Sequence, residues 1–407
     1  MTINQHAETF AGKPVKDYKP AVGLVAGPMK RREFQFTEGT SKKFWAIELE
    51  GTRHTVHFGR IGTAGQTQTK EFDNEDKARK SYEKLLAEKV NKGYVEVTAP
   101  TEAKEAEAKP APSKSRKKAS PEPELPVALR LDLSYEEARE GGRLTDRLAA
   151  LLQDPAAGQV SALVIGNWSF EGENAAPIVE ALVAARDKLT NLKSLFLGDI
   201  VMEEQEISWI QQTDMSPLFD AYPELEHLRI RGGTGLSLGT VKHKHLQSLI
   251  LESGGLPVEV VRAVGSAKLP ALEHLELWLG TPEYGGNATV EDLQPILAGK
   301  QFPKLHYLGL RDSEMADQVA AAVAQAPVLK KIRVLDLSLG NLSDEGAKAL
   351  LASPAVAQLE KLDIHHHYVS KELVKQLKAL GITVDAGDPE EPDEYDDEVH
   401  RYIAVSE

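Results

Sequence analysis

Apolar and polar residues alternate in the first part of the chain, and this pattern predicts short β-strands. The alternation covers residues 33–36, 44–49 and 55–58, with glycine-containing turns between the segments. A period of two places successive side chains on opposite faces of a sheet. Residues 73–91 change to helical spacing, with Ala78, Tyr82 and Leu85 on one face together with Leu86 and Val90. The pattern therefore predicts a small antiparallel sheet with one packed helix over residues 30–97.

The larger part of the chain, residues 127–388, contains an internal repeat. The pattern L-x-x-L-x-L recurs at offsets of 21 to 33 residues, and each copy precedes a stretch with helical spacing. Its seven copies begin at Leu192, Leu225, Leu246, Leu272, Leu305, Ile332 and Leu359. Residues 128–133 and 160–165 look like earlier, degenerate strands of the array. Such a repeat predicts an α/β solenoid with a curved parallel sheet and outer helices.

Three further segments complete the predicted domain organisation. Residues 98–126 are rich in Ala, Pro, Glu, Lys and Ser, and we expect a disordered linker because this composition buries too little apolar surface to offset the entropy of ordering. Residues 389–407 form an acidic tail that we expect to cap the open end of the array. Residues 1–29 are assigned as an N-terminal extension.

Composition and charge indicate the cellular location of the protein and the part of the chain that would meet a charged partner. The 407 residues include no Cys, which excludes disulfides and cysteine-bound zinc and favours the cytoplasm. Residues 1–126 carry 23 Lys and Arg against 18 Asp and Glu, whereas the rest carries 25 against 44, within a net charge of −14. A polyanion would therefore meet the N-terminal part first. The sequence has no apolar run long enough for a membrane span, and residues 1–13 lack the apolar core of a signal peptide.

A glycine-rich turn follows the third predicted strand. Gly59, Gly62 and Gly65 lie within seven residues, which indicates a sharp turn or a close backbone approach. Nucleic-acid binding requires an aromatic face, cations and backbone donors in one place. The candidate nucleic-acid-binding residues around this turn are Phe58, Arg60, Lys42, Lys43 and Lys70. Packing of Phe58 into the core is the alternative that the sequence leaves open, whereas Trp45 is expected inside.

The predicted strands of the repeat region expose every second residue on the concave face, the usual binding surface of a solenoid. Arg and Trp dominate protein interface energetics, and the acidity of this region favours a protein partner over nucleic acid. The candidate protein-binding residues are Arg229, Arg231, Glu276, Trp278, Arg311, Asp336 and His365, with Phe196 beside them. Adjacent histidines 365–367 alternate faces on a strand, so at most His365 and His367 could share a metal, and we predict no metal site. We also predict no cofactor and no catalytic residue.

Several residues of the first part form a set with a characteristic spacing, namely Phe44-Trp45, Gly59-Arg60-Ile61-Gly62, Gly65-Gln66, Lys70, Phe72 and Lys92-Gly93-Tyr94. With this set, residues 30–97 resemble a WGR domain, a module found in poly(ADP-ribose) polymerases and in many bacterial proteins. The signature tryptophan is Phe58 here. In the polymerases that aromatic lies against the sugar at a DNA end, and the arginine two positions on takes part in contacts to DNA or neighbouring domains. The resemblance therefore implies DNA contact by Phe58 and Arg60, weakened by the missing indole N–H.

The repeats resemble leucine-rich repeats of the longer, helix-containing kind, most closely at residues 332–350. Linker and repeats occupy the remainder of the chain, which leaves no room for an ADP-ribosyltransferase. We therefore expect a non-enzymatic bacterial adaptor whose WGR-like module binds DNA ends or breaks and whose solenoid binds a protein. A scaffold or regulator that binds only proteins is the alternative.

Overall fold

The structure is a computed structural model that divides into two units. The smaller unit is Pro20–Glu122, and the larger combines Met1–Lys19 with Pro123–Glu407. The structure describes residues 6–18, 29–38, 41–50, 52–61, 63, 66–72, 95–96, 128–168, 170, 172–395 and 398–406, with helical residues 77, 78, 81, 82, 84, 85 and 89. The predicted linker 98–126, positions 62 and 65 of the glycine-rich turn, Leu86, Val90 and residues 92–94 lie outside this part.

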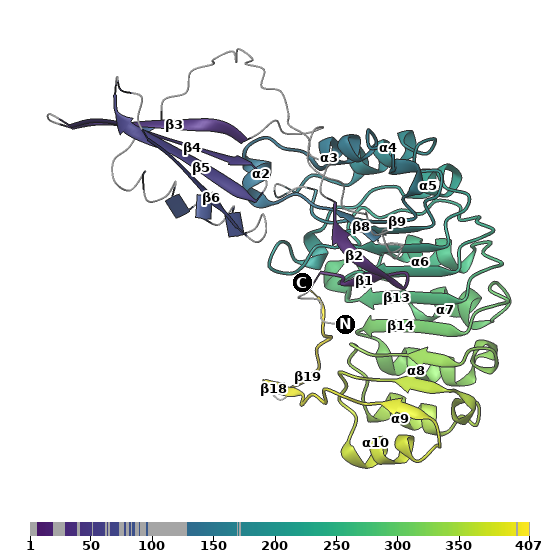
Figure 1. Cartoon of the computed structure of the whole chain (residues 1–407). Helices are drawn as coiled ribbons and strands as arrows, with labels where there is room; N and C mark the ends of the chain where they lie inside the picture. The colour runs from purple at the N-terminus through teal and green to yellow at the C-terminus, as the bar shows by residue number, and fades with distance from the viewer. Residues whose placement is uncertain are drawn as a thin grey trace, which may run out of the picture. The chain divides into compact units, whose positions relative to one another are not determined.

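The smaller unit contains a five-stranded antiparallel sheet in the order β6-β5-β4-β3-β7 (Figure 1). All three strands expected from period-two alternation are present and are longer than predicted. The strands are β3 (Met29–Glu38), β4 (Ser41–Glu50), β5 (Arg53–Arg60), β6 (Gln66–Glu71) and β7 (Val95–Glu96).

One face of this sheet packs against the predicted helix. Trp45 is only 3% exposed, and its ring centroid lies 5.6 Å from that of Phe34. Ile47 and Val56 extend this cluster on the sheet, and Tyr82 joins it from the helix. Burying side chains of this size contributes roughly 1.5–3 kcal/mol each, which explains why so small a sheet holds a helix. The prediction that Trp45 lies in the core is confirmed.

The larger unit is built on a 12-stranded sheet in which every pair except β1–β2 is parallel. Strand order follows chain order from end to end (Figure 1). Its strands are β1 (Thr9–Phe10), β2 (Lys13–Asp17), β8 (Ala128–Leu131), β9 (Ala162–Ile165), β10 (Ser194–Leu197), β11 (His227–Arg231), β12 (Ser248–Glu252), β13 (His274–Gly280), β14 (Tyr307–Ser313), β15 (Val334–Asp336), β16 (Lys361–Asp363) and β17 (Thr383–Asp385).

Helices follow most of these strands and cover one face of the sheet, here called the helix face (Figure 1). The other face is called the open face. Within the described part of the chain, no helix has the length and apolar character needed to cross a bilayer. The helices are α2 (Tyr135–Arg139), α3 (Leu144–Leu151), α4 (Ala176–Ala184), α5 (Ser216–Ala221), α6 (Val258–Gly265), α7 (Val290–Leu297), α8 (Ala316–Gln325), α9 (Asp344–Leu351) and α10 (Lys371–Lys378).

The repeated leucines determine this arrangement. The seven predicted copies coincide with strands β10 to β16. Parallel pairing in constant register places the second leucine of each copy beside the same leucine of the next, and all of these side chains are buried. This row is Leu195, Leu228, Leu249, Leu275, Leu308, Leu335 and Leu362. One apolar core therefore continues through the whole unit.

Residues 6–18 belong to the larger unit, so the expected separate N-terminal extension is not what the structure contains. Strand β2 pairs in parallel with β8, with Val15 opposite Ala128. Strand β1 turns back from it, and Phe10 packs with its ring centroid 5.8 Å from that of Phe196. Phe10 thereby closes a small apolar cluster with Ala162 and Val164. The smaller unit is consequently inserted between the first two strands of the larger sheet and the rest.

The C-terminal tail does not cap the end of the sheet, which corrects the prediction. The sheet ends at β17, and the tail forms a separate hairpin of β18 (Asp393–Tyr395) and β19 (Glu398–His400). The chain then runs back past the arrowheads of the strands, in yellow in Figure 1. The amide of Ala404 donates to the carbonyl of Leu339. The tail thus satisfies a main-chain carbonyl just beyond the end of β15.

Phe10→Ala should lower the free energy of unfolding by about 3 kcal/mol, because it leaves a cavity over Phe196. Urea denaturation followed by circular dichroism measures this change. Thr9→Ala is the matched control, since Thr9 is exposed on the same strand. An unchanged urea midpoint for Phe10→Ala would show that the hairpin does not stabilise the sheet.

Candidate functional site

An aromatic and two cations lie together on the smaller sheet. Register places Phe58 opposite Trp45 and Arg60 opposite Lys43 across strands β4 and β5. Alternation puts these four side chains on one face. Trp45 is buried there, whereas Phe58 is 36% exposed and both cations are exposed. Phe58 is thus at the edge of the core, with part of its ring open to solvent.

The other two predicted nucleic-acid-binding residues lie elsewhere. Lys42 precedes Lys43 on β4, so its side chain points to the opposite face of the sheet. Lys70 pairs in register with His54, four positions along β5 from Phe58, or about 13 Å at strand spacing. Its ammonium group lies 5.0 Å from the ring centroid of Phe72. The structure therefore brings Lys43, Phe58 and Arg60 together and separates Lys42 and Lys70 from them.

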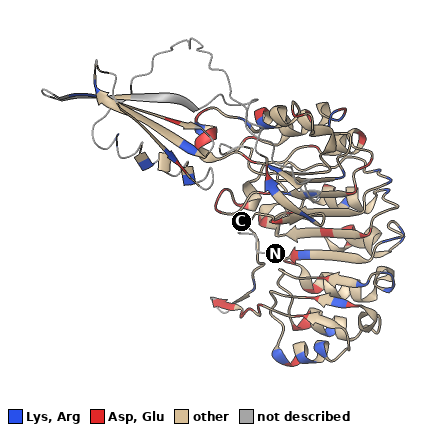
Figure 2. Ribbon diagram, viewed as in Figure 1, with Lys and Arg blue, Asp and Glu red and all other residues tan. Residues whose placement is uncertain are grey.

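The open face of the larger sheet carries rows of polar side chains. The register that aligns the leucines also aligns the residues between them, so Arg231 lies beside Glu252 and Trp278 beside Arg311. Figure 2 shows basic and acidic residues interspersed along these strands. Opposite charges on neighbouring strands can therefore pair across the sheet.

Two arginines of β11 converge on one glutamate of β12. The Nε atom of Arg229 donates to Oε1 of Glu252 at 2.7 Å, and Nε of Arg231 donates to Oε2 at 2.8 Å. Burial raises the pKa of Glu252, but the two guanidinium charges outweigh burial and hold the pKa below its usual range. The Arg229 guanidinium also lies 4.3 Å from the ring centroid of Phe196, a cation–π distance.

A second cluster joins β13 and β14. Glu276 Oε1 accepts hydrogen bonds from Nη1 of Arg311 at 2.6 Å and Nε1 of Trp278 at 2.7 Å. Burial alone would raise the pKa of Glu276, but hydrogen bonds from His274 and Trp278 and the charge of Arg311 lower it to about 2. The arginine also lies 3.4 Å from Asp336, which accepts a hydrogen bond from Tyr307. Arg311 is thus shared by two carboxylates, and hydrogen bonds from Trp278 and Tyr307 stabilise them further.

The C-terminal part of the open face is acidic. Asp363 accepts from Nδ1 of His365 at 2.7 Å and from the ammonium of Lys361 at 2.8 Å. Burial raises the pKa of Asp363, but the bonds from His365 and Lys361 lower it overall. Lys361 also lies 3.5 Å from Asp385. Asp363, His365 and Asp385 have metal-ligand spacing, but the ammonium of Lys361 already lies between the two acids and offsets one of their charges.

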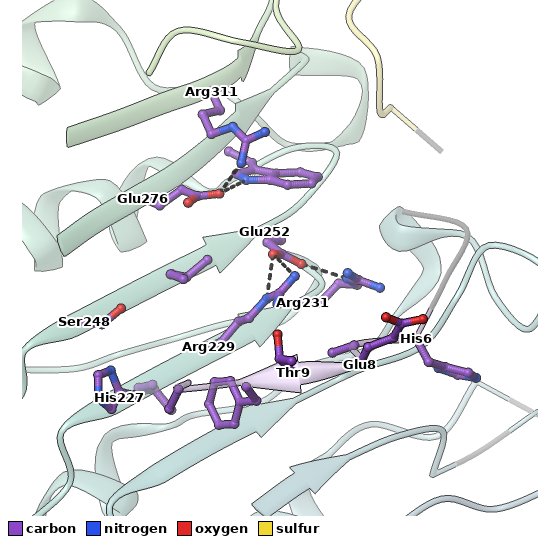
Figure 3. Close-up of a pocket in the computed structure, with 16 residues that line it drawn as sticks. His6, Glu8, Thr9, His227, Arg229, Arg231, Ser248, Glu252, Glu276 and Arg311 are labelled. Atoms are coloured by element: carbon purple, nitrogen blue, oxygen red, sulfur yellow. Dashed lines mark hydrogen bonds and ion pairs between the residues drawn. The ribbon is translucent and has the colours of Figure 1, made fainter. Parts of the chain in front are cut away.

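A pocket of about 460 Å³ opens between the N-terminal hairpin and strands β11 to β14 (Figure 3). Its size is that of a small-molecule or side-chain site. In Figure 3, Glu252 and Glu276 hold the surrounding arginines by dashed contacts. Hairpin residues 6–11 form one wall, and the other lining residues are His227, Leu228, Arg229, Arg231, Ser248, Ile250, Glu252, Glu276, Trp278 and Arg311.

Most predicted protein-binding residues are not exposed as expected. Trp278 is 3% exposed, and Phe196 lies under Phe10 and the arginines. Pairing between neighbouring strands and the N-terminal hairpin cover side chains that alternation alone would leave in solvent. The residues that prove buried are Phe196, Arg229, Arg231, Glu276, Trp278, Arg311 and Asp336, whereas His365 is partly buried. Their role in binding a protein stays a prediction.

Sequence reasoning missed two parts of the pocket. Glu252 directly follows the apolar strand core of its repeat, in the same register position as Arg231 on β11, and this shared position was the available signal. No local pattern indicated that the N-terminal hairpin forms one wall of the pocket. Its strand β2 pairs Val15 with Ala128, and the whole smaller unit separates these two residues in the sequence.

Comparison with known proteins supports the family of the smaller unit. Residues 30–101 match the WGR domain model. The uncharacterized protein YfeS of Escherichia coli is 47% identical over 68 residues, which are 17% of this chain and 28% of YfeS. Protein YehF of the same organism is 45% identical over 65 residues, 16% of this chain and 24% of YehF. The chain thus matches only about a quarter of the length of these curated relatives.

One solved structure extends the similarity to both units. A Bacteroides fragilis protein, solved by the Northeast Structural Genomics Consortium, is 35% identical with a TM-score of 0.62. The alignment covers 92% of this chain and 99% of that protein. The chain therefore belongs to one family with this Bacteroides fragilis protein, and it carries a WGR domain at residues 30–101.

Glu276→Gln should lower the free energy of unfolding by about 3 kcal/mol near neutral pH, because it removes the closer of the two carboxylates that face the buried Arg311 and leaves only Asp336 at 3.4 Å. A folded-state pKa of about 2, below the ordinary 4.5, gives stability that is present above pH 4.5 and is lost as the pH falls toward 2. The difference from wild type should therefore shrink over that window.

Urea denaturation at about pH 7, 4 and 3 checks this expectation. Glu259→Gln is the control, because Glu259 is exposed on α6. A difference that stays constant with pH would contradict the ionised pairing of Glu276.

Proposed function

We propose that the protein is a non-enzymatic bacterial adaptor. In this proposal the WGR domain binds DNA at ends or breaks, and the larger unit is a leucine-rich-repeat solenoid that binds a protein through the open-face pocket. The single observation that carries the DNA part is the placement of the partly exposed Phe58 beside Lys43 and Arg60, where β4 begins and β5 ends. Some members of the WGR family bind nucleic acid, which agrees with this placement.

The physical argument begins with two like charges. Lys43 and Arg60 are directly opposite across β4 and β5, and like charges at such positions destabilise a strand pair. A phosphate placed between them would remove this repulsion and release counterions. The open part of the Phe58 ring would then provide a stacking face for a sugar or base, worth about 1–3 kcal/mol.

The open-face pocket supports the protein-binding part. Arginine and tryptophan line it, and both residue types are enriched where interfaces gain most of their energy. Because Glu252 and Glu276 are engaged by arginines, the pocket supports binding rather than acid–base catalysis. No cofactor enters this proposal, and we assign the protein to the cytoplasm. A scaffold that contacts only proteins is the second candidate, since Phe58 is only 36% exposed and lacks the indole N–H of the signature tryptophan.

Phe58→Ala should weaken binding of a nicked or blunt-ended DNA duplex by about 1–3 kcal/mol, because the stacking face is removed. Arg60→Ala should lower the slope of log affinity against log salt by about one, since one phosphate contact is lost. Fluorescence anisotropy of labelled duplex with the full chain at two or more salt concentrations measures both effects.

Lys84→Ala is the matched control for loss of charge, because Lys84 is exposed on the helix rather than on β4 or β5. If wild type shows no salt-sensitive binding, or if Phe58→Ala and Arg60→Ala bind as wild type does, the scaffold without nucleic-acid contact becomes the correct assignment.

Ser248→Trp should abolish capture of the protein partner, because the half-buried Ser248 lines the pocket and an indole there would fill it without removing an arginine. Affinity purification of the full chain from cell extract, followed by mass spectrometry, gives the comparison. Ser266→Trp, at the exposed end of α6, is the control. Identical sets of captured proteins for the two variants would refute the role of the pocket.

A further inference from the structure

The C-terminal residues of the described chain are bound across the ends of several strands. Ala404 N–H donates to Leu339 O at 2.8 Å, and Val405 N–H donates to Oδ1 of Asp312 at 3.0 Å. The Ser208 hydroxyl donates to the carbonyl of Ser406 at 2.5 Å. The Tyr368 hydroxyl accepts a hydrogen bond from the main-chain amide of Tyr402 at 2.9 Å and donates one to the main-chain carbonyl of Tyr402 at 3.1 Å. The strand-end site is defined here as Ser208, Gly254, Asp312, Leu339 and Tyr368.

All five of these hydrogen bonds reach the main chain of the tail. Recognition of this kind accepts an extended segment with little regard to its side chains, as in other peptide sites that read backbone groups. Side-chain selection comes from Ile403 and Val405, which are 8% and 3% exposed. Tyr402, between Arg401 and Ile403, is 58% exposed. The strand-end site thus fits an extended segment with two aliphatic residues two positions apart.

Gly254 is required for the tail to approach so closely. A Cβ atom at position 254 would lie 2.3 Å from the carbonyl oxygen of Ser406 and 2.3 Å from the Ser208 hydroxyl oxygen. Real Cβ atoms do not come so near to a backbone oxygen, so any side chain here would displace the tail. A substitution at Gly254 can therefore block the strand-end site without any change to the tail itself.

Asp312 makes the bound tail less stable than its contacts suggest. The carboxyl is fully buried, and only Oδ1 is bonded to the tail, while Oδ2 has no partner among the described residues. Burial raises the pKa of Asp312 well above its usual range. An unsatisfied buried oxygen costs about 1–3 kcal/mol, which opposes closure of the site over this group.

The hairpin that precedes the tail is separate from the 12-stranded sheet. Strands β18 and β19 pair with each other and are not part of the 12-stranded sheet. Residues 390–394, before and within this hairpin, are exposed. Release of the tail would therefore leave the pairing of the large sheet intact.

We propose that the strand-end site is a binding site for extended peptide segments of the form aliphatic-x-aliphatic, and that residues 401–406 are an intramolecular occupant that exchanges with such a segment of a partner protein. This site is distinct from the open-face pocket, and its test uses none of the pocket residues.

Competition with the tail sets the size of the expected effect. A tethered segment has an effective concentration of about 1 mM. For a free peptide that binds the vacated site with a Kd of about 0.1 mM, the tethered tail would weaken apparent binding about tenfold. Vacating the site within the full chain should remove this competition.

The experiment titrates a fluorescein-labelled peptide with the sequence of residues 398–406 into two full-length proteins. One is wild type, and the other carries Ile403→Ser and Val405→Ser, which removes both buried side chains of the tail. We expect the variant to bind the peptide at least tenfold more tightly than wild type. Equal affinity for the two proteins, or no binding to the variant at about millimolar protein, would overturn the proposal.

A third substitution tests where the peptide binds. Adding Gly254→Ala to the tail variant should weaken peptide binding at least tenfold, since the Cβ atom would lie only 2.3 Å from the position of the Ser406 carbonyl oxygen. Gly158→Ala is the control, because a Cβ there meets only ordinary contacts of 3.7 Å or more. If both glycine variants bind alike, the peptide is not in the strand-end site.

Hydrogen exchange of the wild-type chain gives a readout that does not depend on any variant folding. An exchangeable tail predicts that the amides of Ala404 and Val405 exchange at least tenfold faster than those of strand β13. Equal protection of tail and strand amides would show that the tail opens only with the whole unit, and the proposal would be wrong.

Discussion

Constant register between parallel strands is the constraint on which the larger unit depends. The pairing that places Leu228 beside Leu249 also places Arg231 beside Glu252 on the opposite face. A slip by one residue would turn the leucines outward and bring the charges into the core, so both faces enforce the same alignment. The paired charges are buried without remaining uncompensated, because each glutamate accepts bonds from an arginine. The open face is thus an ordered polar surface whose arginines hold fixed positions around the pocket.

Both ends of the described chain lie on this sheet. The N-terminal hairpin extends the sheet at β8 and covers the apolar end of the open face with Phe10. The C-terminal tail crosses the strand ends and reaches Ser208, which lies between β10 and β11 near the middle of the sheet. The WGR domain is inserted between two segments that pair with each other, so the larger unit is complete only when residues on both sides of the insertion are present. This organisation connects a DNA-binding candidate and a protein-binding candidate within one folded chain.

Local patterns in the sequence were sufficient for much of the fold. Alternation predicted β3 to β5, and every L-x-x-L-x-L copy is a strand, because both signals are short-range consequences of which face is buried. The pairing of Val15 with Ala128 was not predictable, since two short strands far apart in sequence carry no local mark of their partner. The exposure of Trp278 was predicted wrongly for a related reason. Alternation gives the face on which a side chain lies, but not the Glu276 and Arg311 contacts that enclose it there. At the smaller site, register decided that Lys43 joins Phe58 and Lys42 does not.

In the proposed function the two units bind different partners. The WGR domain contacts DNA, and the acidic larger unit binds a protein. Hydrogen–deuterium exchange of the full chain with and without a blunt-ended duplex tests this division most directly. The account predicts that protection increases in peptides from β4 and β5, which carry Lys43, Phe58 and Arg60, and stays unchanged in peptides from β11 to β14. Protection of β11 to β14 by DNA, or no change in β4 and β5, would contradict it.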